Sequence, residues 1–374
     1  MPAIANGTIR QAAVEVGIDL VGFARAAPME DARRGIEDCI EAGLVPKDTD
    51  WKTEDPSAFC DPRSVLLSAR CVVVAAQCCL ADEPDDLSRP GEPHGLIARY
   101  TRRNHYRDLR DRLKKLSLAL GKVCGAAPRS KCLSCGPLAE KPLAREAGLG
   151  WYGKHGIVIT LEFGSWVVLG ELVTELEIEP DSPMPERCGD CSACIKACPT
   201  GAIKAPGRLD RSRCIQHLTN SPHPIPHEWR TAWGKRLYGC TACQEACPMN
   251  ARVRPTGLRV AVGVVGPSIP LLPLLKMSEA EYGARYPDNQ ISARWVRFDC
   301  IKRNACLALG NAGDPAAVDP LTEALRSDPS PLVRGHAAWA LGKLDDGRTR
   351  SALDRALGQE TDAGVRDEVS SALD

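Results

Sequence analysis

Hydrophobic residues in the first half of the chain switch between helical and strand-like spacing. Apolar positions recur every three to four residues in three segments, at about 8–17, 28–43 and 105–124. Short apolar runs rich in valine and isoleucine, which favour strands, lie at 71–76, 156–161 and 165–169. Helices that alternate with strands in this way predict an α/β domain over residues 1–180.

The end of the chain repeats itself with a period of 32 residues. The tripeptide at 308–310 recurs at 340–342 and, with one change, at 372–374. A fixed period with two apolar helical stripes in each unit indicates an α-solenoid. We therefore predict HEAT-like repeats over 296–374, after a connector at 256–295 that has no clear period. Such a solenoid is equally suited to support the preceding domain and to dock a partner.

Composition narrows the class of protein. The chain of 374 residues has 48 basic and 48 acidic side chains, so any nucleic-acid site must be local. It has no apolar run long enough for a membrane helix and no secretory leader, so we expect a cytoplasmic protein that does not enter a membrane. Eighteen cysteines in a reducing compartment point to metal rather than to disulfides.

Eight of these cysteines follow the spacing of a bacterial ferredoxin. The first run, Cys-x2-Cys-x2-Cys-x3-Cys-Pro, begins at Cys188, and a second run begins at Cys240. In such runs three thiolates converge on one iron–sulfur cube and the fourth reaches a neighbouring cube. We predict two [4Fe–4S] clusters in a ferredoxin-like domain over 181–255, held by Cys188, Cys191, Cys194 and Cys247 and by Cys198, Cys214, Cys240 and Cys243. Zinc is the alternative, although zinc sites favour two separated cysteine pairs.

Segments spread along the chain resemble the epoxyqueuosine reductase family. The resemblance is carried by residues 17–25, 61–63, 136–144, 148–154, 164–171, 198–203 and 238–244. It extends over nearly the whole chain, including the repeats. It implies that the α/β domain binds cobalamin and that the reaction removes an epoxide oxygen from a modified tRNA wobble base. It also implies a low-potential electron donor such as flavodoxin or ferredoxin.

The same resemblance indicates which residues form the cofactor site. The family's cobalamin cradle matches Arg63, Gly148, Gly150, Trp151, Tyr152, Gly153, Lys154, His155, Ser165, Trp166 and Gly170. Glycines would let a bulky macrocycle approach the backbone, and Lys154 would meet a corrin amide or a developing oxyanion. Ordinary turn chemistry for the glycines and core packing for the tryptophans are the alternatives.

The chain departs from the family at the proton donor. The family has an aspartate two residues before a Gly-Pro pair, and here Ser134 occupies that place. A serine hydroxyl is too weak an acid to replace a carboxylic acid, so Cys135 and Lys154 join Ser134 as catalytic candidates. Cys132 and Cys135 are alternatively small buried residues, or ligands of a further metal together with Cys78, Cys79 or Cys124.

Residues 99–131 form a local basic segment, with eleven Lys or Arg against two acids. Tyr100 and Tyr106 are interleaved with these bases, which suits phosphate contact combined with base stacking. We expect tRNA to bind here; an ordinary solvated helix is the alternative. Two other functions remain open at this point: the same cofactors acting on a small molecule, and an electron carrier without catalytic activity.

Overall fold

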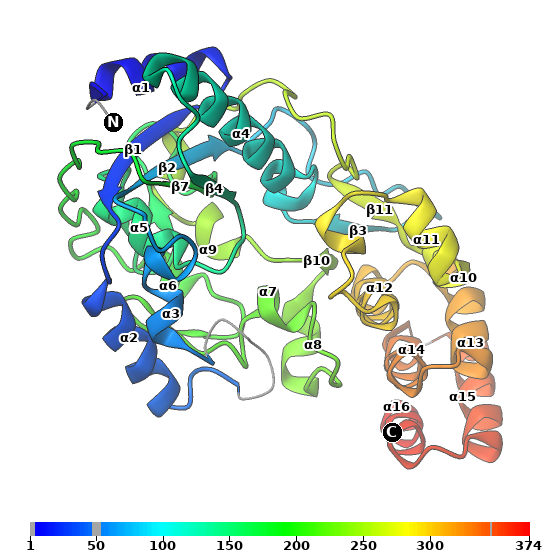
Figure 1. Ribbon diagram of the computed structural model, residues 1–374. Coiled ribbons are helices and arrows are strands. Elements are labelled where there is room, and N and C mark those ends of the chain that lie inside the picture. The colour runs from blue at the N-terminus through cyan, green and yellow to red at the C-terminus, as the bar shows by residue number, and fades with distance from the viewer. Residues whose placement is uncertain (1–3, 47–53, 345) are drawn as a thin grey trace. The chain divides into compact units, whose positions relative to one another are not determined.

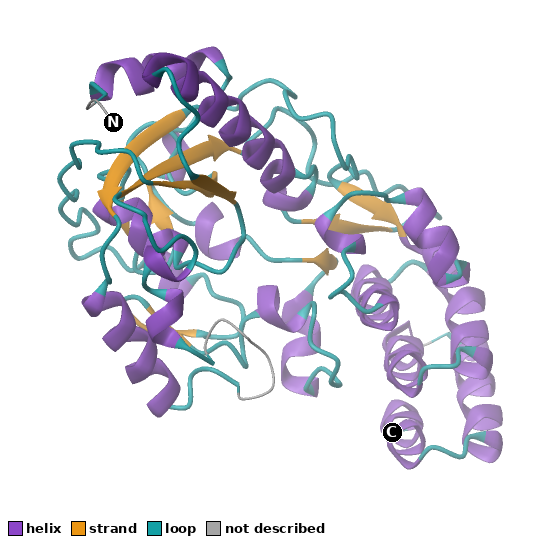
Figure 2. Ribbon diagram, viewed as in Figure 1, coloured by secondary structure: helices purple, strands orange, loops and turns teal. Residues whose placement is uncertain are grey.

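The computed structural model describes residues 4–46, 54–344 and 346–374 (Figures 1 and 2). The chain divides into two compact units, each assembled from three segments. Unit 1 comprises 1–82, 104–212 and 242–262, and unit 2 comprises 83–103, 213–241 and 263–374. Both units therefore contain parts of the predicted α/β and ferredoxin-like regions, whose boundaries stay a prediction.

Unit 1 is built on a four-stranded sheet in the order β1-β2-β7-β4, with every pairing antiparallel. Its strands are β1 (Leu20–Arg25), β2 (Cys71–Cys78), β7 (Val167–Thr174) and β4 (Ser130–Leu133). The apolar run predicted at 71–76 is β2, whose eight residues are all buried. The run at 165–169 enters β7, and the run at 156–161 contributes only β6 (Val158–Ile159), paired with β5 (Trp151–Tyr152).

Helices cover both faces of this sheet. On one face α4 (His105–Cys124) packs its fully buried leucines, among them Leu109 and Leu113, against β7. On the other face α5 (Glu140–Glu146) packs Leu143 and Ala144 into a core with residues of β2 and β7. The helix predicted at 105–124 has these bounds because Asn104 caps its start and Gly125, with φ +71°, ends it. The predicted helices at 8–17 and 28–43 are α1 (Asn6–Glu15) and α2 (Glu30–Glu41).

The remaining elements of unit 1 are short and surround the cysteines. They are α3 (Pro56–Phe59), η2 (Pro62–Ser64), α6 (Ala193–Lys196), β8 (Ile203–Ala205), β9 (Arg208–Leu209), α9 (Ala242–Glu245) and η4 (Asn250–Arg252).

Unit 2 joins a small sheet to the helical repeats. The sheet has the order β10-β3-β11, from β10 (Arg236–Tyr238), β3 (His94–Ile97) and β11 (Ser268–Pro270). The short elements beside it are η3 (Arg99–Thr101), α7 (Ile215–Leu218), α8 (His227–Trp233) and η5 (Gln290–Ser292). The stretch predicted as a connector at 256–295 has a regular structure of its own, because β11 pairs with β3 and is followed by α10 (Leu271–Lys276) and α11 (Glu279–Arg285). Helices this short carry too few turns to show a period in the sequence.

The predicted repeats form a stack of paired helices. They are α12 (Phe298–Ala312), η6 (Pro315–Ala317), α13 (Val318–Ser327), α14 (Pro331–Leu344), α15 (Gly347–Gln359) and α16 (Ala363–Leu373). In Figure 1, α12, α14 and α16 stack in one row, and α13 and α15 stack in the other. The 32-residue period places alanine and leucine, including Ala308 and Leu341, in the core between the rows. Across 4–46, 54–344 and 346–374, every helix is too short or too polar to cross a bilayer.

Candidate functional site

Three cysteines predicted for the first cluster lie together in unit 1. Cys194 is in α6, Cys247 follows α9, and Cys188 lies in the loop before α6. Burial raises the pKa of the Cys194 thiol, and the neighbouring Cys247 and Cys188 raise it further. Thiols this close repel one another once deprotonated, so a metal centre is needed to hold them as thiolates. The fourth predicted ligand, Cys191, is exposed in the same loop.

The backbone after Cys198 favours its thiolate. Burial alone would raise the pKa of this thiol, but N–H groups of the following turn, including those of Ala202 and Thr200, together lower the pKa. The Ala202 N–H donates to Sγ at 3.2 Å. A lowered thiol pKa suits a metal ligand, because thiolate is the form that binds iron.

The other cysteines predicted for the second cluster come from two parts of the chain. Cys214 lies directly before α7 and Cys240 follows β10, both in unit 2, whereas Cys243 lies in α9 of unit 1. The assignment of individual ligands to the two clusters stays a prediction.

The predicted cradle glycines are required by the packing of unit 1 itself. A Cβ on Gly150 would lie 2.2 Å from the Ile159 carbonyl oxygen, and one on Gly148, where φ is +66°, would lie 2.6 Å from the Ser182 oxygen. A Cβ on Gly153 would meet the His155 ring at 2.5 Å. The chain's own atoms therefore fill the space next to these glycines, as the turn-chemistry alternative expected.

Two other cradle residues present buried polar atoms that lack partners. Trp151 Nε1 and His155 Nε2 have no hydrogen-bond partner within the described part of the chain. Burial, and secondarily the charge of Lys141, lowers the pKa of His155 to about 4, so its ring is neutral near pH 7. Burial also raises the pKa of Tyr152. Buried polar atoms without partners are costly, so an amide-rich ligand would compensate for them here.

Ser165 connects the cradle to the second cysteine run. Its backbone N–H donates to Asn250 Oδ1 at 2.7 Å, and its hydroxyl accepts from Asn250 Nδ2 at 2.8 Å. Gln244 Nε2 donates to the Ser165 carbonyl at 2.8 Å. A Cβ on Gly164 would lie 2.1 Å from Asn250 Oδ1, so only glycine fits beside this network. The sequence reading missed Gln244 and Asn250, whose only signal was their place within and just after the cysteine run.

The structure corrects the expected role of Gly170. It lies in the middle of β7, and a Cβ there would meet the Leu133 oxygen at 2.9 Å and a Leu113 methyl at 3.0 Å. Gly170 therefore allows β4 and α4 to approach β7 and is not open to a cofactor. Trp166, directly before β7, is buried, while Arg63 is exposed in η2.

Lys154 is bound to the cysteine loop. Its Nζ donates to the Gly189 carbonyl oxygen at 2.5 Å, directly after Cys188. The cation therefore lies next to the first predicted cluster, where it would stabilise negative charge on the thiolates. This contact ties the cradle hairpin to the first cysteine run.

The loop that carries Ser134 and Cys135 follows β4. Ser134 Oγ donates to the Leu169 carbonyl oxygen at 2.7 Å, which continues the pairing between β4 and β7. Cys135 is exposed with φ +55°, and its N–H and that of Gly136 donate to the Glu140 carboxylate at the start of α5. The serine is thus engaged in the sheet, whereas the neighbouring thiol faces solvent.

Glu171 is a buried carboxylate that the sequence did not single out. It is fully buried on β7, in register with Leu133 of β4. Along β7 it lies between Leu169 and Val173, which face α5. This carboxylate therefore lies on the strand against which the Ser134 loop is held.

The remaining cysteines of unit 1 differ in their surroundings. In 4–46, 54–344 and 346–374, no three His, Cys, Asp or Glu side chains form a ready site for a single metal ion, and this holds for the predicted cluster cysteines as well. Burial raises the pKa of Cys78, which is buried, and partial burial raises that of Cys132, which is half-buried on β4.

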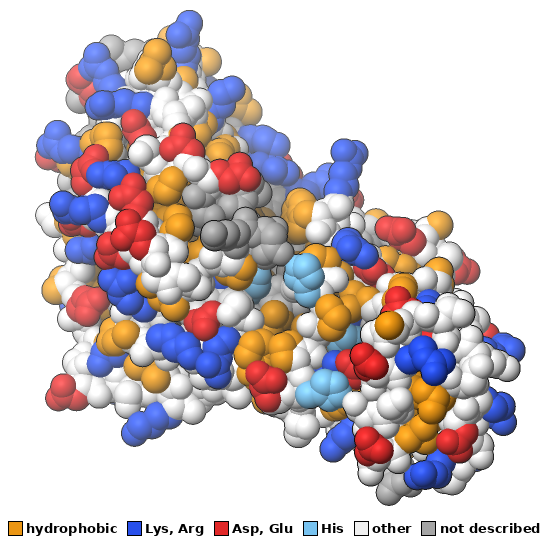
Figure 3. Space-filling view, turned by 90° about the horizontal axis from the view of Figure 1, so that it is seen from below, with side chains coloured by type: hydrophobic (Ala, Val, Ile, Leu, Met, Phe, Trp, Pro, Cys, Tyr) orange, Lys and Arg blue, Asp and Glu red, His pale blue; other side chains and the backbone are white. Residues whose placement is uncertain are grey.

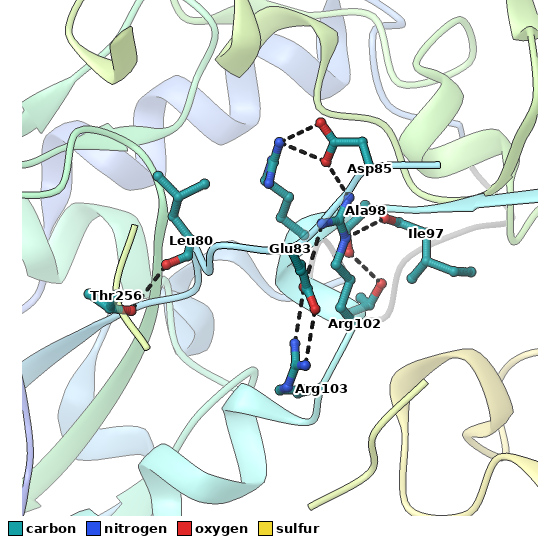
Figure 4. Close-up of polar contacts among 10 residues, drawn as sticks. Leu80, Glu83, Asp85, Ile97, Ala98, Arg102, Arg103 and Thr256 are labelled. Carbon is teal, nitrogen blue, oxygen red and sulfur yellow. Dashed lines mark hydrogen bonds and ion pairs between the residues drawn. The ribbon is translucent and has the colours of Figure 1, made fainter. Parts of the chain in front are cut away.

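Part of the basic segment is paired with acidic side chains (Figure 4). Arg103 makes a two-pronged contact with Glu83, with both N–O distances 3.0 Å, and Arg102 contacts Asp85 at 2.7 Å. Arg99 also pairs with Asp85, at 2.7 Å. These three arginines of unit 2 are therefore paired with carboxylates, and tRNA binding by the segment stays a prediction. The hydroxyl of Tyr100 is buried as well, so this end of the residue is turned away from a base.

Two family models match parts of the chain. One, a 4Fe–4S double cluster binding domain, matches residues 187–250, and the other, HEAT repeats, matches residues 298–374. The predicted double-cluster domain and the predicted repeats are thereby confirmed.

Relatives with curated names and solved structures are similar along nearly the whole chain. Epoxyqueuosine reductase of Bacillus anthracis is 33% identical over 366 residues, covering 96% of this chain and 94% of the relative. The crystal structure of selenomethionine-labeled epoxyqueuosine reductase matches with a TM-score of 0.89 and 30% identity, covering 98% of this chain and 97% of the other. Epoxyqueuosine reductase with a tRNA-Tyr epoxyqueuosine-modified stem loop matches with a TM-score of 0.88, 30% identity and the same coverage.

Proposed function

Because the chain belongs to the epoxyqueuosine reductase family, we propose that it removes the epoxide oxygen from the modified wobble base of tRNA and leaves an alkene. The chain is an oxidoreductase with a double [4Fe–4S] cluster domain. The observation that carries the proposal is the match, over 98% of the chain, to a reductase solved with an epoxyqueuosine-modified stem loop. The comparisons favour neither a small-molecule substrate nor a carrier without catalytic activity.

Removal of the epoxide oxygen as water consumes two electrons and two protons. When bound, the clusters would supply low-potential electrons singly, and the cobalt of cobalamin would collect them for the substrate. The cradle residues suit such a cofactor, because Trp151 Nε1 and His155 Nε2 are buried, polar and unpaired among the residues that the structure describes. We assign these two side chains, with Tyr152, to cobalamin amides. Lys154 anchors the hairpin that carries them to the cysteine loop.

The proton supply differs from the family pattern at Ser134. Its hydroxyl proton is engaged with the Leu169 carbonyl, and serine is a weak acid, so this residue positions the loop. Cys135 is exposed on the same loop, and the Glu140 carboxylate fixes its backbone. We assign proton delivery to the Cys135 thiol, with solvent as the source that reprotonates it.

The tRNA would contact the exposed basic face of α4. Arg110, Lys115 and Lys122 are exposed on this helix, while its buried leucines face the sheet. Phosphates are bound by such exposed cations, and paired buried arginines are not available to them. Elsewhere the surface is mixed: on the face drawn in Figure 3, basic and acidic side chains are interspersed.

The test uses the full chain purified without oxygen and reconstituted with cobalamin. We expect about eight irons per chain, a corrin absorbance band, and conversion of epoxyqueuosine tRNA to queuosine tRNA by a low-potential reductant. Cys240→Ser should abolish turnover and leave unit 1 folded, whereas Cys39→Ser, outside the cysteine runs, is the matched control. Iron near four per chain, or no uptake of cobalamin, would refute the proposal.

The proton assignment has its own test. Cys135→Ala should lower kcat at least tenfold and leave the cluster and corrin spectra unchanged, because only the proton source is removed. Ser134→Asp in the Cys135→Ala background should restore turnover by supplying a carboxylic acid on the same loop. An unchanged kcat in Cys135→Ala would assign the proton to another group.

A further inference from the structure

Tyr100 places a buried hydroxyl beside two predicted cluster ligands in unit 2. The residue lies in η3, and its Oη is buried and has no hydrogen-bond partner in the described part of the chain. Burial raises its pKa first, and Tyr238 and the thiols of Cys240 and Cys214 raise it further. A weaker contact with the Gln216 side chain acts in the opposite direction and lowers this pKa. The place of the hydroxyl beside the second cysteine run is shown geometrically by Gly239, the residue before Cys240.

The backbone before Cys240 is shaped around this hydroxyl. Gly239 has φ +73°, and a Cβ there would lie 2.5 Å from Tyr100 Oη and 2.7 Å from the Ala98 Cβ. Any other residue at 239 would collide with the tyrosine and would be strained at this φ. The hydroxyl is thus packed directly against the peptide that leads into Cys240.

The segment that carries Tyr100 is held rigidly. The Ala98 N–H donates to the Tyr238 carbonyl oxygen at 3.0 Å, and Thr101 Oγ1 donates to the Ala98 oxygen at 3.0 Å. Arg99 and Arg102, on either side of the tyrosine, both pair with Asp85. The ion pairs of the basic segment therefore fix the position of Tyr100, which gives them a role other than RNA binding.

We propose that the Tyr100 hydroxyl donates a hydrogen bond to a sulfur of the cluster held by Cys214 and Cys240, and that it thereby sets the reduction potential of that cluster. The proposal rests on the proposed function only for the presence of the clusters. The Tyr100 hydroxyl is a buried donor that has no hydrogen-bond partner among the described residues, so a cluster sulfur is a suitable acceptor for it. The negative charge on such a sulfur increases when the cluster is reduced. Stabilising the reduced form raises the potential of this cluster relative to its neighbour. Tyr100 is a tuning residue and need not touch the substrate.

The test is a potential-controlled titration of both clusters in the full chain, followed by electron paramagnetic resonance. In Tyr100→Phe the reduced-to-oxidised ratio of the cluster held by Cys214 and Cys240 should fall up to about tenfold at a fixed potential. A tenfold fall corresponds to a decrease of about 59 mV in the reduction potential of a one-electron couple. The other cluster should not change. An exchangeable deuteron coupled to the reduced cluster in heavy water should disappear in the same variant. Tyr282→Phe is the matched control, since it removes a buried hydroxyl that donates to the Ile291 oxygen at 3.0 Å in the same unit.

A second variant decides the matter even if Tyr100→Phe assembles poorly. Replacing Tyr100 by 3,5-difluorotyrosine keeps the shape but strengthens the donor, so the ratio should shift in the opposite direction. The proposal is overturned if the potentials of both clusters match the parent in both variants, or if the fluorinated variant shifts the ratio the same way as phenylalanine. Failure of the proposed function is distinguishable, because a parent protein that holds both clusters but does not convert epoxyqueuosine tRNA still gives both potentials.

Discussion

The basic segment 99–131 contains two regions of the same charge in opposite surroundings. In the first, Arg102 and Arg103 are only 5% and 9% exposed and are paired with carboxylates. In the second, Arg110 and Lys115 are exposed on the polar face of α4. A buried cation must be paired because desolvation is costly, whereas an exposed cation is free to bind phosphate. The number of basic residues in a segment therefore does not measure the size of an RNA-binding surface.

Removing the carboxylate of the buried region should have the largest effect on stability. Glu83→Gln leaves Arg102 and Arg103 with less compensating charge, and Glu83 itself is only 10% exposed. We expect a loss of about 3–5 kcal/mol in the free energy of unfolding, measured by urea denaturation under anaerobic conditions. Asp111→Asn is the control: it breaks the exposed pair with Lys114 and should cost less than about 1 kcal/mol. Equal losses in the two variants would contradict the distinction.

A buried histidine shows the other way to avoid the cost of a buried charge: it stays neutral instead of being paired. Burial, and then the charges of Arg230 and Arg303, lower the pKa of His336 well below its ordinary value. Its Nε2 accepts the Ile225 N–H at 3.1 Å, which requires a ring nitrogen without a proton. Below about pH 6.5 the unfolded chain takes up a proton that the folded chain refuses, so stability falls as pH falls.

The expected slope from His336 is up to about 1.4 kcal/mol per pH unit below pH 6.5. In His336→Gln the amide oxygen can still accept the Ile225 N–H, and this part of the slope should vanish. Urea denaturation at several pH values measures the slope in both proteins. An identical slope in the parent and the variant would show that His336 is not the group excluded from protonation.

The smallest expected change in stability concerns the exposed region. The double variant Arg110→Ala with Lys115→Ala should weaken binding of epoxyqueuosine tRNA several-fold and reduce the salt slope by about 2, without affecting folding. Fluorescence anisotropy at several salt concentrations measures both quantities. Arg34→Ala, on the exposed surface of α2, should leave them unchanged. If the double variant binds like the parent, α4 is not the RNA-binding surface.

Features that depend on short stretches of sequence were predicted well. The helix at 105–124, the buried strand beginning at Cys71 and the repeated helices follow from periodic apolar positions, which local geometry dictates. The double-cluster domain follows from cysteine spacing, because short loops fix how thiolates converge. In contrast, β1 and β4 were missed. β1 contains glycine and alanine, which are not typical of strands, and β4 is short and half polar, so pairing with β2 and β7 makes them strands.

The class of protein, the cysteines that are candidates for iron, and the helical tail were all predictable, because each is encoded in residues that are close along the chain. The roles of individual polar residues became clear only from the folded chain. It showed that Gly150 and Gly170 make room for the protein's own atoms, that Arg102 and Arg103 are neutralised by acids about 20 residues away, and that the buried Tyr100 hydroxyl packs against Gly239. These roles arise from contacts between distant segments, and the energy of a polar group depends on whether such a contact replaces the water it loses on burial.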